Sequence, residues 1–211
     1  MSNPPDADEG TASAAPAEAE AADAFAEYAR NLADLVGAEG WISEFDTVRI
    51  LVDRDGWVDA IRKARDEADL PFFSWLSAID WSADSAVGEG VADPEEVEER
   101  YEVICRLSSV RSADAAHFVA SLPKTDAVID SLVPLFGGAA WHEREAHEMF
   151  GIDFRGHPNL VKLYLPDAFE GHPLRKSYPL LSRELKPWPG AVDVEDMPSV
   201  ENPEASAGGG E

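Results

Sequence analysis

Histidines and glutamates that could bind a metal ion are concentrated in residues 141–150, which read Trp-His-Glu-Arg-Glu-Ala-His-Glu-Met-Phe. A helical zinc protease site needs two histidines four residues apart, with a glutamate beside the first. His142 and His147 are five residues apart, which separates them by about 140° around a helix. The spacing disfavours zinc, and His142 instead shares a helix face with Ala146 and Phe150, as a packed residue would. A free-standing His/Glu metal hydrolase stays open as an alternative function.

The same stretch holds four charged residues, Glu143, Arg144, Glu145 and Glu148. Two of the carboxylates could act as a general acid and base. The group could instead form an exposed charged helix face, or ion pairs against another subunit. We favour an exposed face or ion pairs over acid–base catalysis, because Arg144 between two glutamates offsets their charge rather than raising a carboxyl pKa. His147 follows Glu143 by four residues, so an ion pair between them is possible.

A five-residue pattern that ends in Gly-His-Pro occurs twice, at residues 154–158 and 169–173. The two loop histidines, His157 and His172, could bind a metal ion or a quinone head group. More often such a residue hydrogen-bonds a backbone carbonyl and holds a turn. We therefore predict a structural role for both.

The chain is strongly acidic, with 42 Asp and Glu against 17 Lys and Arg and a net charge of −25. Such a surface repels phosphates, so neither nucleic acid nor an anionic lipid surface is an expected partner. Arg175 and Lys176 form a rare basic pair, suited to acidic side chains across an interface. No apolar stretch approaches the ~20 residues that span a bilayer. Cys105 is the only cysteine, so a cluster that needs about four thiolates cannot be held by this chain alone.

Hydrophobic periodicity predicts an α+β domain over residues 23–151, with helices packed on a mostly antiparallel sheet. The expected order is a helix from 23 to 36, a strand at 48–52, a helix at 57–64, a strand at 72–81, a solvated loop at 82–99, strands at 101–107 and 117–122, and helices at 128–136 and 139–150.

The two ends of the chain differ from this domain. Residues 1–22 and 198–211 are acidic and poor in large apolar side chains, so we predict disordered tails. Eight of the 15 prolines lie in residues 158–211, yet residues 159–197 are rich in leucine and aromatics. A run of roughly forty residues reaches over 100 Å when extended. We therefore predict that residues 152–197 form an extended arm that wraps a partner protein. A self-packed Ω-like loop is the alternative.

Residues 141–179 resemble the C subunit of bacterial NADH:quinone oxidoreductase, a peripheral-arm subunit family of complex I. The family signature, Glu-Arg-Glu followed by an acid, Met or Leu, Phe and Gly, is met by residues 143–145 and 148–151. Its continuation is met by the two Gly-His-Pro repeats and by Leu174-Arg175-Lys176. His147 departs from the aromatic that is usual there, and Glu148 from the commoner aspartate. Trp-Pro-Gly at 188–190 and the acidic tails are similar to actinobacterial members, for which the acceptor would be menaquinone.

The resemblance implies a non-catalytic core subunit that braces the quinone-reducing module and carries no cofactor itself. FMN and iron–sulfur clusters in partner subunits would pass electrons from NADH to quinone, coupled to proton translocation. The chain would sit peripherally on the cytoplasmic side of the cell membrane, beside the quinone-binding and cluster-bearing subunits. Related subunits of membrane-bound hydrogenases and of dehydrogenases with other donors leave the electron donor open.

The same resemblance implies that the signature residues lie at subunit interfaces. They are Glu143, Arg144, Glu145, Glu148, Phe150, Gly151, Gly156, His157, Pro158, Gly171, His172, Pro173, Leu174, Arg175, Lys176, Tyr178 and Pro179.

Overall fold

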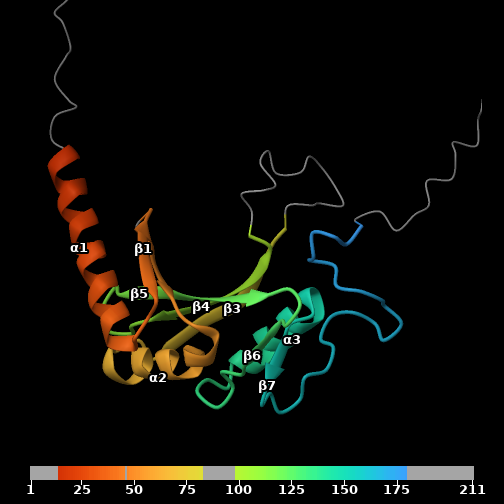
Figure 1. Cartoon of the computed structure of the whole chain (residues 1–211). Helices are drawn as coiled ribbons and strands as arrows, with labels where there is room; N and C mark the ends of the chain where they lie inside the picture. Colours follow the sequence, from red (N-terminus) through yellow and green to blue (C-terminus); the bar gives the residue numbers. More distant parts are fainter. Residues whose placement is uncertain (1–13, 46, 83–97, 180–211) are drawn as a thin grey trace, which may run out of the picture. The chain divides into compact units, whose positions relative to one another are not determined.

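The computed structural model describes residues 14–45, 47–82 and 98–179 (Figure 1). The expectations for residues 1–13, for most of the loop at 82–99, and for the chain after Pro179 lie outside the described residues. Among the described residues, no helix has the length and apolar character needed to cross a bilayer.

Five strands form one sheet in the order β1-β2-β5-β4-β3 (Figure 1). The β2–β5 pair is parallel, and the other three pairs of this sheet are antiparallel. The predicted α+β class with a mostly antiparallel sheet is therefore confirmed. The strands are β1 (Gly40–Glu44), β2 (Thr47–Leu51), β3 (Phe72–Trp81), β4 (Arg100–Ser108) and β5 (Ala115–Pro123).

Within the described residues, three helices accompany the sheet: α1 (Ala14–Val36), α2 (Trp57–Glu67) and α3 (Ala139–Phe150), with a 3-10 turn, η1 (Arg54–Gly56), before α2. α1 begins nine residues before the predicted start at Asp23. Residues 14–22 of the segment expected to be disordered are helical, and their alanine and glutamate content explains why, since both are strong helix formers. α1 ends where predicted, at Gly37, which has φ 76°.

One face of the sheet and the three helices share a single hydrophobic core. Alternate residues of each strand point into it, so Val103 and Cys105 of β4 meet Trp57 and Ile61 of α2 in the same cluster. This period-two pattern is the reason that β4 could be predicted from the sequence.

A second, two-stranded sheet pairs β6 (Val128–Asp130) with β7 (Asp153–Arg155) in parallel. The helix predicted at 128–136 is therefore wrong. Two β-branched residues begin this segment, which suits a strand, and Pro134 denies the helix an interior hydrogen bond. β7 also shows that regular structure continues past Gly151, where the sequence suggested that it stopped.

Candidate functional site

α3 is the element that organises the signature residues. Its apolar side packs against β3 and the core through Ala139, Ala146 and Phe150. Gly151 ends the helix in the left-handed conformation, with φ 73°. A Cβ at this position would lie 2.7 Å from Nε2 of His172. Glycine is therefore required both by the backbone conformation and by the close approach of the second repeat.

The second Gly-His-Pro repeat caps the C-terminus of α3. The last carbonyls of a helix have no partner within the helix. Three of them accept hydrogen bonds from this repeat and the two residues after it: Glu148 O from His172 Nδ1 at 2.8 Å, Met149 O from Leu174 N at 3.1 Å, and Phe150 O from Arg175 Nε at 2.6 Å. The guanidinium also complements the negative end of the helix dipole.

The first repeat holds the opposite end of the same helix. His157 donates from Nε2 to Ala140 O at 3.1 Å and accepts at Nδ1 from the backbone N–H of Asn159 at 3.0 Å. Both repeat histidines thus bind backbone carbonyls, so the structural role favoured from the sequence is confirmed. The repeats fasten residues 157–175 along α3, one at each end.

Glu148 ties the middle of this segment to α3. The residue is 4% exposed, and its carboxylate accepts hydrogen bonds from three backbone N–H groups, those of Leu163 at 2.8 Å, Tyr164 at 2.9 Å and Leu165 at 2.6 Å. Burial alone would raise the pKa of Glu148, but the three donors, aided by the Lys162 ammonium, outweigh it and lower the pKa. The carboxylate acts as a charged anchor for a loop that has no regular structure.

Arg144 fastens the same loop from the adjacent turn of α3. It donates from Nε to Val161 O at 2.8 Å and from Nη2 to Lys162 O at 2.7 Å. Its guanidinium also lies 5.3 Å from the Trp141 ring centroid. Among the described residues, Arg144 forms no ion pair with the flanking glutamates whose charge it was predicted to offset. It binds backbone carbonyls instead.

Glu143 is fully buried and binds the turn after β6. Its Oε2 accepts from Ser131 Oγ at 2.6 Å, and its Oε1 accepts from Leu132 N at 2.6 Å. The exposed charged helix face predicted for Glu143 and Glu148 is thus wrong for both. They also bind different groups, so they do not form an acid–base pair. Glu145 is half-buried, and its side chain makes no hydrogen bond or ion pair within the described residues.

Burial raises the pKa of Glu143 to about 7, although its two hydrogen bonds oppose the shift. Because the folded pKa lies above the unfolded one, the contribution of Glu143 to stability is fully present below pH 4.5 and is lost as the pH rises to about 7. Glutamine does not titrate, so we expect Glu143→Gln to remove this fall in the free energy of unfolding. The fall is about 3 kcal/mol, at 1.36 kcal/mol per pKa unit. Urea unfolding of both chains between about pH 4.5 and 8 measures it. Glu145→Gln is the control, and parallel pH profiles for Glu143→Gln and the parent would contradict the assignment.

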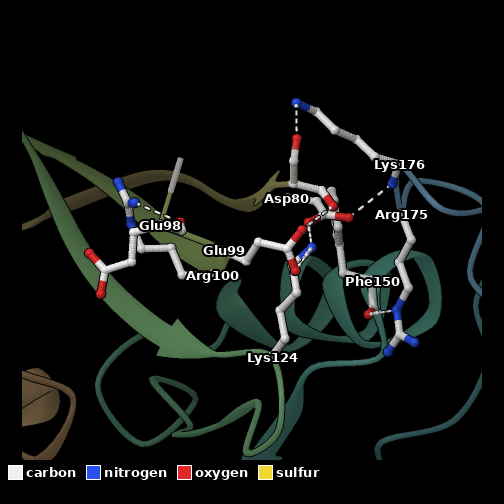
Figure 2. A network of polar contacts seen from close by, with 9 residues as sticks. Asp80, Glu98, Glu99, Arg100, Lys124, Phe150, Arg175 and Lys176 are labelled. Atoms are coloured by element: carbon white, nitrogen blue, oxygen red, sulfur yellow. Dashed lines mark hydrogen bonds and ion pairs between the residues drawn. The ribbon is translucent and has the colours of Figure 1, made fainter. Parts of the chain in front are cut away.

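Arg175 and Lys176 connect the second repeat to the sheet (Figure 2). Lys176 N donates to Oδ2 of the buried Asp80 at 2.9 Å, and Lys124 Nζ lies 2.7 Å from its Oδ1. The Arg175 guanidinium lies 5.7 Å from the Tyr101 ring centroid. The Lys176 ammonium itself donates to Ser82 O at 3.3 Å, and the contact with Asp80 is made by the backbone of Lys176. That the charges of this basic pair meet acids across an interface stays a prediction.

The two histidines of α3, His142 and His147, also lie beside backbone carbonyls. His142 Nδ1 lies 3.1 Å from Leu76 O, and its ring packs edge-on against Phe73, which confirms the packed position. His147 Nδ1 lies 2.9 Å from Ile152 O and 3.3 Å from Asp153, so it does not form the ion pair with Glu143 that the spacing allowed. No three His, Cys, Asp or Glu side chains gather in a metal-binding arrangement within the described part of the chain.

Sequence reasoning missed Asp80, Tyr101 and Ser131. Asp80 had a visible signal, because it continues the core-facing alternation of Leu76 and Ala78 on β3, and a buried carboxylate needs a partner. Ser131 and Tyr101 had none, since their contacts join segments that are distant in the sequence.

Comparison with known proteins gives the family. The model of the family described as "Respiratory-chain NADH dehydrogenase, 30 Kd subunit" matches residues 50–184. The C subunit of the NADH-quinone oxidoreductase of Citrifermentans bemidjiense is 36% identical over 145 residues, which cover 69% of this chain and 82% of that one. The corresponding C subunit of Trichlorobacter lovleyi is 31% identical over 149 residues, which cover 71% of this chain and 90% of that one.

A solved structure shows the same fold. A chain of the membrane-bound sulfane sulfur reductase, described as an archaeal respiratory membrane complex, superposes with a TM-score of 0.59 at 18% identity, over 74% of this chain and 86% of that one. The family match includes all the signature residues described above. The chain therefore belongs to the family of respiratory-chain NADH dehydrogenase 30 kDa subunits, whose bacterial relatives are named as the C subunit of NADH-quinone oxidoreductase.

Proposed function

We propose that the chain is a non-catalytic brace of the quinone-reducing module in a proton-translocating NADH:quinone oxidoreductase. The observation that carries the proposal is the hydrogen-bonded attachment of residues 157–175 to α3, combined with large apolar side chains left exposed on both. Trp141 is 61% exposed, Val161 49%, Tyr164 63% and Leu174 52%. We call these four side chains the α3 surface.

Internal hydrogen bonds fix the backbone that carries the α3 surface, through Arg144, Glu148 and the two repeats. A loop ordered in advance loses less conformational freedom when it binds. Exposed apolar groups on ordered backbone mark interaction sites. These features support a protein–protein interface at the α3 surface.

The names of the relatives support the choice of partner. In Methylococcus capsulatus, a protein named as the C/D subunit of NADH-quinone oxidoreductase is 38% identical over 143 residues, which are 66% of this chain and 23% of that longer one. A subunit of the D type is therefore the first partner that we propose. The cluster-bearing subunits come next.

In this proposal, FMN and the iron–sulfur clusters belong to partner subunits, and quinone is the substrate of the whole complex. The chain's only cysteine, Cys105, is fully buried in β4, and burial raises the pKa of its thiol. In this proposal the chain is a peripheral subunit, and its contribution is to position the neighbouring subunits on the cytoplasmic side of the membrane.

The fold match to the sulfane sulfur reductase chain motivates one alternative, an equivalent subunit in a hydrogenase or in a dehydrogenase with another donor. The names of the curated relatives favour NADH. Identification of a flavin-bearing NADH-binding subunit in the purified complex decides between them.

We expect the double variant Trp141→Ala, Tyr164→Ala to fold normally but to assemble poorly. Both side chains are exposed, so the melting temperature should change little, whereas aromatic anchors carry much of an interface's binding energy. The measurement is the amount of this chain that stays with the complex during gentle extraction from membranes. Val110→Ala, at an exposed site on the β4–β5 connection, is the control. Normal assembly with lowered turnover per complex would instead indicate a direct catalytic role.

A further inference from the structure

The face of the sheet opposite the shared core has its own composition. Trp75, Arg106, His117 and Arg49 lie side by side across strands β3, β4, β5 and β2. None of them belongs to the helix-covered core, and neither do their buried neighbours Ile104 and Val119. We call this surface the open face.

The β3 side of the open face is apolar. Trp75 is half-buried and packs on His117, with ring centroids 5.6 Å apart. Ile79 and Trp81 continue the same side of the strand and are 38% and 37% exposed. Large side chains of this kind are enriched at protein interfaces and rarely line a bare surface together.

The neighbouring strands carry three arginines on this face, Arg49, Arg100 and Arg106. Glu102 forms ion pairs with two arginines, Arg49 at 3.3 Å and Arg100 at 2.8 Å. Arg106 has no carboxylate partner among the described residues; its guanidinium lies 3.5 Å from His117 Nε2. Burial lowers the pKa of His117, and the charges of Arg106 and Arg49 lower it further.

A cavity of about 300 Å³ adjoins Arg106 and His117 at the end of these strands. Tyr28 of α1 also lines it, and its buried hydroxyl has no hydrogen-bond partner among the described residues. Burial, with the charge of Asp114, raises the pKa of Tyr28 to about 12, so the hydroxyl keeps a proton to donate. Asp114, also on the lining, accepts from Ser112. A guanidinium and a free phenol O–H suit a carboxylate group.

We propose that the open face binds an acidic segment of another subunit, which sets apolar side chains on Trp75, Ile79 and Trp81 and a carboxylate on Arg106. This contact rests on the proposed function, because the partner is another subunit, but it is separate from the α3 surface and does not depend on it. A second copy of this chain is disfavoured, because a symmetric contact would place the same arginines opposite each other. The chain's own acidic end, residues 191–211, has no aromatic, leucine or isoleucine with which to cover the tryptophans.

The test places a photo-crosslinking residue, p-benzoylphenylalanine, at Ser77 in the full chain within the assembled complex. Ser77 is exposed on β3 between Trp75 and Ile79 on the same face. The matched control position is Glu67, exposed at the end of α2. After irradiation, mass spectrometry identifies the linked peptides. We expect Ser77 to link to a peptide of another subunit that contains Asp or Glu, and Glu67 not to link to it.

The charge contact is tested in the same chain. Arg106→Glu should reduce the Ser77 cross-link about tenfold or more, since it sets like charges opposite each other, whereas Arg106→Lys should retain most of it. If Arg106→Glu fails to fold by circular dichroism, Arg106→Gln replaces it. The proposal is overturned if Ser77 links no better than Glu67, links to residues 180–211 or a second copy, or links equally well without the positive charge. Loss of binding at the α3 surface alone would leave this result unchanged.

Discussion

Replacing Glu148 with alanine is expected to lower the free energy of unfolding by about 3 kcal/mol, because three backbone N–H groups lose one shared acceptor. Within the described residues, the loop at 163–165 has no other anchor of this kind, so assembly into the complex should fall with it. Glu148→Gln keeps one acceptor oxygen and should lose about half as much. Chemical unfolding and recovery of assembled complex measure the two effects.

The pH dependence gives a second readout for Glu148. Its folded pKa is lowered, so its contribution is present above the unfolded pKa and is lost as the pH falls through the folded value. This is opposite in sign to Glu143, whose pKa is raised. Glu145→Ala is the control and should stay within about 0.5 kcal/mol of the parent. A Glu148→Ala chain as stable as that control would show that the three hydrogen bonds contribute nothing.

Arg175→Ala is expected to release the second repeat from α3 and weaken assembly. The variant loses the hydrogen bond to Phe150 O, the positive charge at the helix C-terminus and the contact with Tyr101. Together these are worth about 2 kcal/mol. Arg175→Lys keeps the charge without the Nε–H donor, so its stability and assembly should lie between those of the parent chain and of Arg175→Ala. Proteolysis of the isolated chain, together with the yield of complex, measures the release.

Arg155→Ala is the matched control for Arg175, because it removes a guanidinium whose ion pair with Asp130 is largely exposed, and such pairs contribute little. Equal proteolysis and yield for both alanine variants would contradict the capping role. An Arg175→Ala complex that assembles fully but turns over slowly would mean that the residue acts on electron or proton transfer.

Patterns confined to one segment could be predicted from the sequence. α3 was predicted correctly because Gly137-Gly138 precede it and Gly151 ends it. β4 was predicted correctly because its core residues alternate. The predictions failed where a distant partner decides the outcome. Glu143 looked like a surface charge, yet it shares a helix face with Ala146 and Phe150 and meets Ser131, twelve residues earlier in the chain.

The proline-rich segment is also held by contacts with residues that are distant in the sequence. Up to Pro179 it folds back on α3 and the sheet through the two repeats, Glu148 and Asp80. A chain without regular secondary structure can be held this way when side chains supply the hydrogen bonds that a strand would make. No local period encodes such contacts. Whether the remainder of the predicted arm wraps a partner stays a prediction.

Hydroxyl-radical footprinting of Trp141 and Tyr164, in the isolated chain and in the assembled complex, tests the bracing role most directly. Both rings are more than half exposed in this chain. They should be oxidised readily when the protein is alone, and several-fold less once its neighbours are bound. Equal oxidation in the two states would show that no neighbouring protein covers this surface and would contradict the account.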